Sequence, residues 1–187
     1  MKRIALALAL IAAVTASLLL YQEGLRLTGN FHQVVAGQLY RSAQPDAAQL
    51  ARWSRESGIR SVVNLRGSQP GAAWYDEEVA ASADLGLVHA DFGMSAEQPF
   101  TPARAEELLA LMASLPKPIL IHCHTGADRT GLAAMIYAYR AGGQDEETAE
   151  SQLSLAYGHV GLPFVSPTFA MDWSWETLEV AFGIEGS

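Results

Sequence analysis

One ten-residue segment brings together residue types that could hold an anion in front of a nucleophile. Residues 122–131 read HCHTGADRTG, and Cys123 is the only cysteine of the 187-residue chain. An apolar run, residues 118–121, precedes the thiol, and Arg129 follows the thiol after five intervening residues, just before a second apolar run. A thiol is therefore expected where a buried strand ends, and a guanidinium where a helix begins, with a loop of small residues between them.

This short loop predicts a site for a tetrahedral anion such as phosphate. Where a loop closes onto a helix N-terminus, the N–H groups of residues 124–129 can converge, and the helix dipole adds a positive field. Gly126 tolerates a positive φ, and Arg129 offers a planar fork for two phosphate oxygens. The same field favours the thiolate, which is the nucleophilic form of cysteine. We expect Cys123 to attack bound phosphate and the Thr130 hydroxyl to help the sulfur leave.

Other interpretations explain fewer of these residues. A buried free cysteine is often only a small core residue, and strand–loop–helix turns also occur without a ligand. The Gly-Lys-Ser/Thr that ends a Walker A nucleotide loop is absent. Zinc ligation by His122, Cys123 and His124 is disfavoured, because neighbours at a strand end point apart and no second pair has metal spacing. Neither a metal nor another cofactor is therefore expected.

The elements that must position the loop alternate along the chain. Hydrophobic patterns and turn residues predict strands at 59–65 and 87–90 and a third that follows Pro118 and ends at Cys123. They predict helices at 45–57, 74–85, 101–115, 129–141, 145–156 and 167–182. This alternation predicts an α/β fold with a central parallel or mixed sheet flanked by helices. Ligands bind at the carboxyl ends of the strands in such sheets. The topology therefore gathers Cys123, Arg66 and Asp91 at one rim.

Asp91 is the candidate general acid for a leaving oxygen. It follows a predicted strand, lies 32 residues before Cys123, and precedes a loop with Gly93 that could close over a substrate. A general acid contributes about 10²–10⁴-fold to the rate. An aspartate at this position could also cap a turn, and Glu97 and Asp84 are weaker candidates for the same role.

The remaining candidates surround the thiol. Phosphate binding is assigned to the loop as a set: His124, Thr125, Gly126, Ala127, Asp128 and Arg129. The carboxylate of Asp128 would repel a phosphate dianion, so we expect it to point away and hold nearby loop or backbone groups. His122 either orients the nucleophile or is an ordinary core histidine. Arg41 and Arg66 are expected to be structural, and Arg66 has the better claim to bind substrate.

HCHTGADRTG resembles the active-site loop of the cysteine-dependent protein tyrosine and dual-specificity phosphatases, whose pattern is His-Cys-x5-Arg-Ser/Thr. Its ending, GADRTG, is similar to that of bacterial and atypical dual-specificity-like members. Segments 31–34, 39–45, 62–66 and 157–159 agree, and the resemblance covers roughly residues 31–160. It implies hydrolysis of a phosphorylated protein or a small phosphorylated molecule through a phospho-cysteine, with Cys123 as nucleophile, Arg129 holding phosphate and Asp91 as acid.

Two alternatives share the loop, and a third is disfavoured. An inositol-phosphate or phosphoinositide phosphatase would use the same residues, although the phosphoinositide-specific relatives carry loop lysines that this chain lacks. A catalytically weak phosphate-binding module would not need Cys123, Arg129, Thr130 and Asp91 together. A sulfurtransferase is disfavoured, because the rhodanese loop is one residue shorter and lacks the Arg-Thr-Gly ending.

Residues 1–21 form a separate hydrophobic segment that is expected to be helical. Two basic residues precede the uncharged run 4–20, whose 17 residues are at the low end of the ~17–25 that span a bilayer. The run is either a signal peptide, with a small-residue cleavage site at 14–16, or an uncleaved anchor. The leucines at 18–20 extend the run past that site and favour the anchor. Both interpretations leave the basic end inside and the following domain exported, to the periplasm or another extracytoplasmic space.

The rest of the chain is expected to be a connector, 22–37, and one phosphatase domain, 38–187. The chain has 12 Lys and Arg against 20 Asp and Glu, and without residues 1–20 the balance becomes about −10. Such an acidic domain is a poor partner for nucleic acid. A lone cysteine forms no intramolecular disulfide. The sequence predicts neither a specific substrate nor an oligomeric state.

Overall fold

The computed structural model describes residues 2–184. Five strands and seven α-helices follow one another with two short 3₁₀ helices near the C-terminus. In chain order they are α1 (Lys2–Thr28), β1 (His32–Val35), β2 (Leu39–Ser42), α2 (Ala47–Ser57), β3 (Ser61–Asn64), α3 (Ala73–Asp84), β4 (Val88–Asp91), α4 (Pro102–Ser114), β5 (Ile119–His122), α5 (Asp128–Arg140), α6 (Glu146–Glu150), η1 (Leu155–Tyr157), η2 (Pro167–Phe169) and α7 (Ala170–Phe182).

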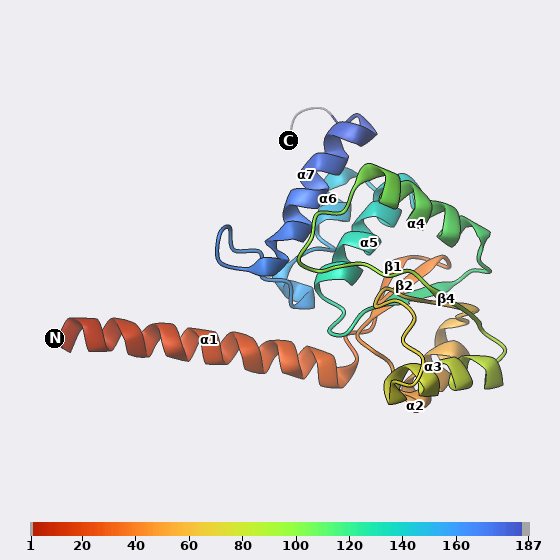
Figure 1. The fold of residues 1–187 in the computed structure, drawn as a ribbon, viewed down its shortest axis with the longest axis horizontal. Helices are drawn as coiled ribbons and strands as arrows, with labels where there is room; N and C mark the ends of the chain where they lie inside the picture. Colours follow the sequence, from red (N-terminus) through yellow and green to blue (C-terminus); the bar gives the residue numbers. More distant parts are fainter. Residues whose placement is uncertain (1, 185–187) are drawn as a thin grey trace.

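The strands form one mixed sheet in the order β1-β2-β5-β3-β4. The edge strand β1 is antiparallel to β2, and the other neighbours are parallel. The predicted α/β class with a central mixed sheet is confirmed (Figure 1). Because β5 lies in the middle of the sheet, the residue that follows it, Cys123, is placed at the centre of the carboxyl rim.

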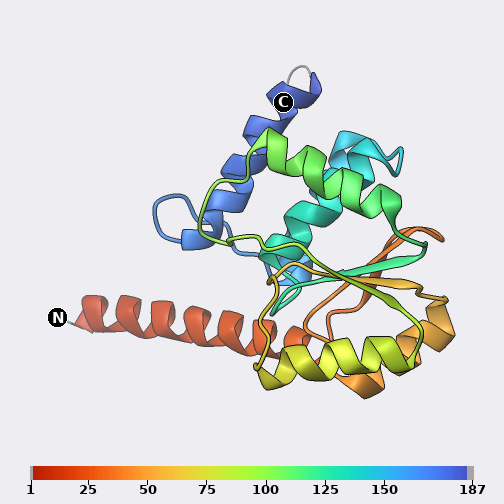
Figure 2. The same cartoon turned by 45° about the vertical axis from the view of Figure 1, so that its right-hand side comes forward.

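Helices cover both faces of the sheet (Figure 2). The buried residues form two hydrophobic cores, and alternate residues of β5 contribute to each of them. Ile119 and Ile121 belong to the larger core, and Leu120 belongs to the smaller one. The larger core includes the buried faces of α4, α5 and α7, and the smaller one is formed with α2. This alternation is what a strand buried on both faces requires.

Local signals in the sequence set the bounds of two helices. Asp46 accepts a hydrogen bond from the backbone of Gln49 in a capping box at the start of α2, and Gly58 ends that helix with a left-handed φ of 68°. Thr101 caps α4, and Pro102 occupies its first turn. Both helices therefore lie close to their predicted ranges.

Two parts of the chain differ from the sequence-based expectation. Strand β1 lies inside the segment 22–37 that was expected to be a connector, and it forms a hairpin with β2. The expected helix 145–156 ends at Glu150 and continues as turns and η1. Beyond Glu150, Gln152 and Leu153 donate to carbonyls three residues back and so form turns, and the carbonyl of Gln152 accepts a hydrogen bond from the guanidinium of Arg41.

The N-terminal helix α1 projects from the domain (Figure 1). It extends past the apolar run to Thr28, and none of its described residues is buried. By length and composition it could cross a membrane, a test that signal sequences also pass. Its C-terminal half is attached to the domain, because Tyr21 donates to the carbonyl of Ala156 at 3.1 Å and Gln22 donates to that of Gly158 at 2.7 Å.

Candidate active site

The thiol lies where the loop leaves the sheet. Cys123 is buried, follows the central strand β5 and belongs to the larger core. Helix α5 begins five residues later at Asp128. The structure therefore places the thiol at a strand end and Arg129 in the first turn of a helix, as the spacing predicts.

Side chains from outside the loop bind its carbonyl oxygens. Arg41, fully buried on β2, donates from Nη2 to the carbonyl of Gly126 at 2.7 Å and to that of Ala127 at 3.5 Å. Asn30 donates to the carbonyl of Thr125 at 3.1 Å. Burial lowers the pKa of Arg41 to about 10, so the guanidinium remains charged at neutral pH. Arg41 is therefore structural, as expected, and it holds successive carbonyls on the outside of the loop.

Gly126 is required by both conformation and space. Its φ is +74°, and a Cβ there would lie 2.6 Å from the amide nitrogen of Ala43 and 2.7 Å from the carbonyl oxygen of Ser42. In the described part of the chain, the N–H groups of residues 124–126 have no protein acceptor. Amide groups left in this way, ahead of a helix N-terminus, are suited to an anion.

The two polar side chains after the loop are also largely unpaired. Arg129 makes one long contact, from Nη1 to the carbonyl of Met94 at 3.5 Å, and its buried Nε has no partner among residues 2–184. No described carboxylate forms an ion pair with it. The Thr130 hydroxyl is buried and likewise forms no hydrogen bond within the described chain, the sulfur of Cys123 included. Its role in helping the sulfur leave stays a prediction.

Asp91 is the last residue of β4 and is held by two donors. Asn64, its register partner on β3, donates to Oδ1 at 2.9 Å, and the hydroxyl of Tyr75 donates to Oδ2 at 2.6 Å. The hydrogen bond to Asp91 raises the pKa of Tyr75, so the phenol stays protonated and remains a donor. The sequence placed Asp91 on this rim, and the two groups that orient it come from β3 and α3, the two elements that precede β4 in the chain.

Arg66 lies on the same rim. Its guanidinium stacks over the ring of Trp74, 3.4 Å from the centroid, and donates to Gln44 at 2.8 Å. Burial, followed by the positive charge of Arg129, lowers the pKa of Arg66, while the neighbouring Cys123 acts in the opposite direction. Arg66 is therefore close enough to Cys123 and to Arg129 for both groups to affect its pKa.

A buried carboxylate behind the loop was missed by the sequence analysis. Glu78 of α3 contacts the Nε2 atoms of His122 at 3.0 Å and of His89 at 2.8 Å, and Gln44 also donates to it. Burial alone would raise the pKa of Glu78, but His122 and His89 lower it to about 2. Tyr75, Glu78 and Ser82 share the buried face of α3, so helical spacing was the available signal. His122, the residue before Cys123, is thus anchored by a negative charge.

Asp128 points away from the loop, as the repulsion argument predicts. Its Oδ1 lies 2.7 Å from Nδ1 of His159, and Nε2 of the same imidazole lies 2.9 Å from Asp172 on α7. Only the backbone of Asp128 is therefore left for a phosphate. Burial alone would lower the pKa of His159, but the hydrogen bonds to Asp128 and Asp172 raise it to about 9.

The ion triad formed by Asp128, His159 and Asp172 makes stability depend on pH. The folded chain keeps the His159 proton up to about pH 9, whereas the unfolded chain loses it near 6.5. The stabilisation is thus fully present below pH 6.5 and is lost as the pH rises to about 9. For a side chain 3% exposed, this shift corresponds to about 3 kcal/mol. Urea unfolding of the full chain at pH 6 and pH 9.5 should show this loss, and His159→Gln should remove most of it. Equal losses in both proteins would contradict the assignment.

The edge of the loop faces the end of α1. His124 is exposed, and its pKa is lowered by burial of its ring atoms, by Arg66 and by Arg26 of α1. Glu23 of α1 acts on the same imidazole with the opposite sign. The mouth of the site is therefore within electrostatic range of the turns that follow the apolar run of α1.

A family model covers most of this arrangement. The model described as "DSP-PTPase phosphatase fused to NAD+ Kinase" matches residues 26–161, more than half of the chain. The match begins near the end of α1 and includes the hairpin, the loop and η1. No curated protein matches the chain.

Solved structures share the fold at low sequence identity. The crystal structure of P. aeruginosa TpbA is 21% identical with a TM-score of 0.58, and the match covers 83% of this chain and 92% of that one. The core catalytic domain of the PP-IP phosphatase SIW14 from S. cerevisiae, in complex with citrate, is 19% identical with a TM-score of 0.59, covering 82% and 93%. PTPMT1 is 12% identical with a TM-score of 0.56, covering 82% and 99%.

The family match and the site agree with the resemblance noted in the loop. The matched range contains Cys123 and Arg129 at the required spacing, and the described fold is that of the solved phosphatases. The chain belongs to the cysteine-dependent protein tyrosine and dual-specificity phosphatase family and is a phosphatase.

Proposed function

We propose that the chain hydrolyses phosphomonoesters through a phospho-cysteine at Cys123. The thiolate attacks phosphorus, and the bond to the ester oxygen breaks as Asp91 gives that oxygen a proton. Water then attacks the phospho-cysteine, and Asp91 takes a proton from the water as the S–P bond breaks. Inorganic phosphate leaves, and the thiolate and the protonated Asp91 are restored.

The observation that carries this proposal is the way the loop at 123–129 is held. Arg41 and Asn30 bind its carbonyls from outside, so its N–H groups and the guanidinium of Arg129 are left for an anion. Donors placed in this way before the substrate arrives can stabilise the charge on the equatorial oxygens in the transition state. A buried thiol at the base of the same loop would face the phosphorus.

Asp91 is proposed as the acid because its carboxylate is oriented but not neutralised by a cation. Each oxygen accepts one hydrogen bond, from Asn64 or from Tyr75, and neither neighbour is basic. Arg66, on the same rim, is proposed to attract the substrate anion before it reaches Arg129.

The proposed substrate is a phosphorylated protein or a small phosphorylated molecule. A TpbA variant of the same fold was solved in complex with phosphotyrosine, with 23% identity and a TM-score of 0.52, covering 71% of this chain and 76% of that one. An inositol-phosphate phosphatase is the second candidate, because SIW14, with a similar fold, is named a PP-IP phosphatase. The absence of a loop lysine favours the first candidate over a phosphoinositide phosphatase.

A substrate panel tests this assignment. The full chain in a mild detergent, with a chelator present, would be assayed for phosphate release from para-nitrophenyl phosphate, phosphopeptides, phosphoinositides and soluble inositol phosphates. We expect turnover of para-nitrophenyl phosphate and of phosphopeptides. Preference for inositol phosphates would support the second candidate. Binding of phosphate without turnover of any substrate would show a phosphate-binding module.

Arg129→Lys is expected to lower kcat/KM by about 10²–10³-fold, because lysine keeps the charge and loses the two-pronged hydrogen bonding to phosphate. Arg60 provides the matched control, since it is an exposed arginine in the turn before β3. Steady-state kinetics with para-nitrophenyl phosphate should show the loss in Arg129→Lys and unchanged values in Arg60→Lys. Similar values for both variants would remove Arg129 from the phosphate site.

We also propose that α1 anchors the domain to a membrane, with the domain exported. No described residue of the apolar run is buried, which suits a helix surrounded by lipid. Removal as a signal peptide is the other outcome. The N-terminal sequence of the mature protein, and its extraction from membranes by detergent but not by carbonate, would distinguish the two.

A further inference from the structure

A second apolar feature lies outside both the core and the catalytic loop. In the segment between η1 and η2, Phe164 is fully exposed, and Val165 and Leu162 are 75% and 51% exposed. Leu155 of η1 adds a further side chain, also 51% exposed. We name these four residues the docking surface. Large apolar side chains gathered in this way mark an interaction site.

The backbone presents these side chains outward. Val165 and Ser166 both donate to the carbonyl of Leu162, at 3.1 and 2.9 Å, and so close a turn. At its tip Phe164 has a φ of +62°, a conformation that is rare for a bulky residue. The segment 160–166, VGLPFVS, carries no charged residue. Its shape is thus maintained by backbone hydrogen bonds, and its apolar side chains are left to a partner.

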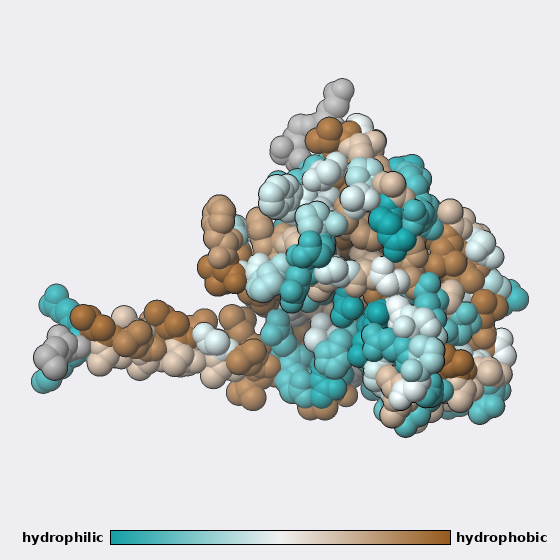
Figure 3. All heavy atoms as spheres, viewed as in Figure 1, coloured by the Kyte–Doolittle hydropathy of each residue, from teal (hydrophilic) through white to brown (hydrophobic). Residues whose placement is uncertain are grey.

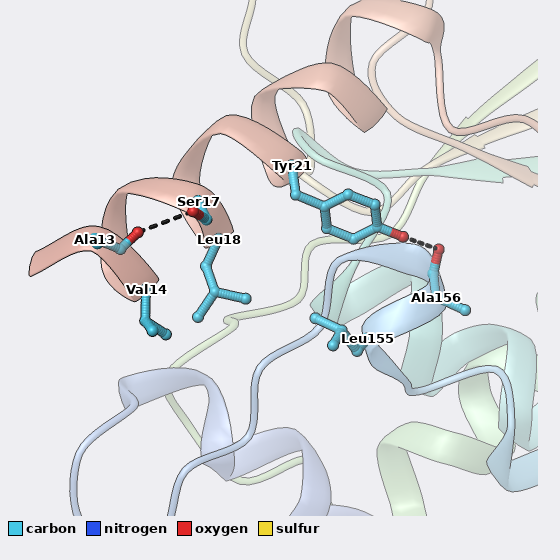
Figure 4. A pocket seen from close by; sticks show the side chains of 7 residues that line it. All are labelled: Ala13, Val14, Ser17, Leu18, Tyr21, Leu155 and Ala156. Carbon is cyan, nitrogen blue, oxygen red and sulfur yellow. Dashed lines mark hydrogen bonds between the residues drawn. The ribbon is translucent and has the colours of Figure 1, made fainter. Parts of the chain in front are cut away.

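One member of the docking surface, Leu155, lies beside α1. Leu155 and Ala156 form an apolar groove with Val14, Leu18 and Tyr21 of that helix (Figure 4). The hydrogen bond from Tyr21 to the carbonyl of Ala156 closes one end of the groove. In the space-filling view, brown side chains gather on the side of the domain from which α1 projects (Figure 3). The turn and the helix therefore lie on the same side of the molecule.

We propose that the docking surface inserts into the interfacial region of the bilayer that α1 crosses. A bilayer is the partner that would surround the exposed apolar run of α1, and the turn, which lies on the side of the domain from which α1 projects, would meet that same bilayer (Figure 1). Because segment 160–166 is uncharged and the domain is acidic, apolar insertion and not attraction to anionic lipid would hold it. The inference goes beyond phosphate hydrolysis, and it rests on the proposed anchoring by α1.

Two attachment points would fix the orientation of the domain. A single helix leaves a domain free to rotate above the membrane, whereas α1 and the docking surface together define a face. The catalytic loop lies near that face: Gln22 of α1 donates to the carbonyl of Gly158, and Asn30 donates both to the neighbouring Tyr157 and to the loop residue Thr125. The mouth of the site would then be held close to the membrane surface.

A fluorescent probe at Phe164 tests the proposal in the full chain. In a Cys123→Ser background, one cysteine is introduced by Phe164→Cys, Leu10→Cys or Ala110→Cys and labelled with an environment-sensitive dye. Leu10 lies within the apolar run, and Ala110 is exposed on α4, away from α1 in Figure 1. Each labelled chain is reconstituted in phosphatidylcholine vesicles with nitroxide lipids that quench at the headgroup end or deep in the acyl chains.

We expect shallow nitroxides to quench the Phe164 probe, deep nitroxides to quench the Leu10 probe, and neither to quench the Ala110 probe. A quenched Leu10 probe with an unquenched, water-exposed Phe164 probe would overturn the docking surface and leave the anchor intact. An unquenched Leu10 probe would overturn the anchor and the docking surface together. The dye at position 164 could instead be unquenched by either nitroxide and change its fluorescence with the protein-to-lipid ratio. That result would assign the surface to a second copy of the chain and overturn the proposal. None of these outcomes depends on catalysis, so the phosphatase mechanism is tested separately.

Discussion

Cys123→Ser is expected to lower turnover by at least about 10⁴-fold while phosphate binding persists. A serine hydroxyl at this position is not ionised at neutral pH. No described side chain is hydrogen-bonded to this position so that it could act as a base and remove the hydroxyl proton. The proposed anion site consists of backbone N–H groups and Arg129, and it does not include the sulfur. The substitution should therefore separate catalysis from binding.

Two measurements check this expectation. Steady-state hydrolysis of para-nitrophenyl phosphate would report the loss of turnover, and calorimetric titration with inorganic phosphate would report retained binding. Arg60→Lys serves again as the control, because Arg60 is exposed and lies outside the loop. Near-normal turnover in Cys123→Ser would exclude a covalent intermediate on this residue. Loss of both activities together with a lowered melting temperature would point to a folding defect, which chemical trapping of a phospho-cysteine in the unmodified chain would then resolve.

Asp91→Asn is expected to lower kcat/KM by about 10²–10⁴-fold for esters with poor leaving groups. An amide keeps the shape of the side chain but has no carboxylic proton to give. The loss should shrink for aryl phosphates whose leaving group is stable without a proton. A plot of log kcat/KM against the leaving-group acidity should thus be steeper for the variant than for the unmodified chain.

The matched controls for Asp91 are the other acidic residues considered for its role. Glu97→Gln alters an exposed carboxylate in the following loop, and Asp84→Asn alters the last residue of α3. Both variants should keep the unmodified slope and rate. If Glu97→Gln or Asp84→Asn showed the leaving-group dependence and Asp91→Asn did not, the acid would have to be reassigned.

The catalytic loop could be predicted because its determinants are adjacent in the chain. The spacing of Cys123 and Arg129, the small residues between them and the flanking apolar runs are all local, and local patterns also set the caps of α2 and α4. The alternation of strands and helices was enough to predict the fold class and the rim that carries Asp91 and Arg66.

The hairpin of β1 and β2 could not be predicted in the same way. Each strand has four residues, and β1 has two exposed and two buried positions, so its pattern is too short to distinguish a strand from a connector. It becomes a strand because β2 pairs with the central β5 and offers a free edge to β1. The turns that follow the shortened α6 also make a contact that is distant in the chain, since the carbonyl of Gln152 accepts a hydrogen bond from Arg41.

The groups that support the loop could not be predicted either, because their contacts are distant in the chain. Arg41, Glu78 and His159 lie 82, 45 and 36 residues from Cys123, so their contacts with the loop and its flanking residues depend on how the elements pack. The sequence by itself was enough to propose Cys123 as nucleophile and Arg129 as the phosphate-binding arginine and to predict the class of fold, since each depends on short-range spacing. Only the tertiary structure decided which side chains bind the loop carbonyls, where Asp128 points and which face carries the docking surface. These features depend on how elements distant in the chain pack together. A polar group that becomes buried in this packing needs a hydrogen-bond partner, and the fold decides which group is within reach.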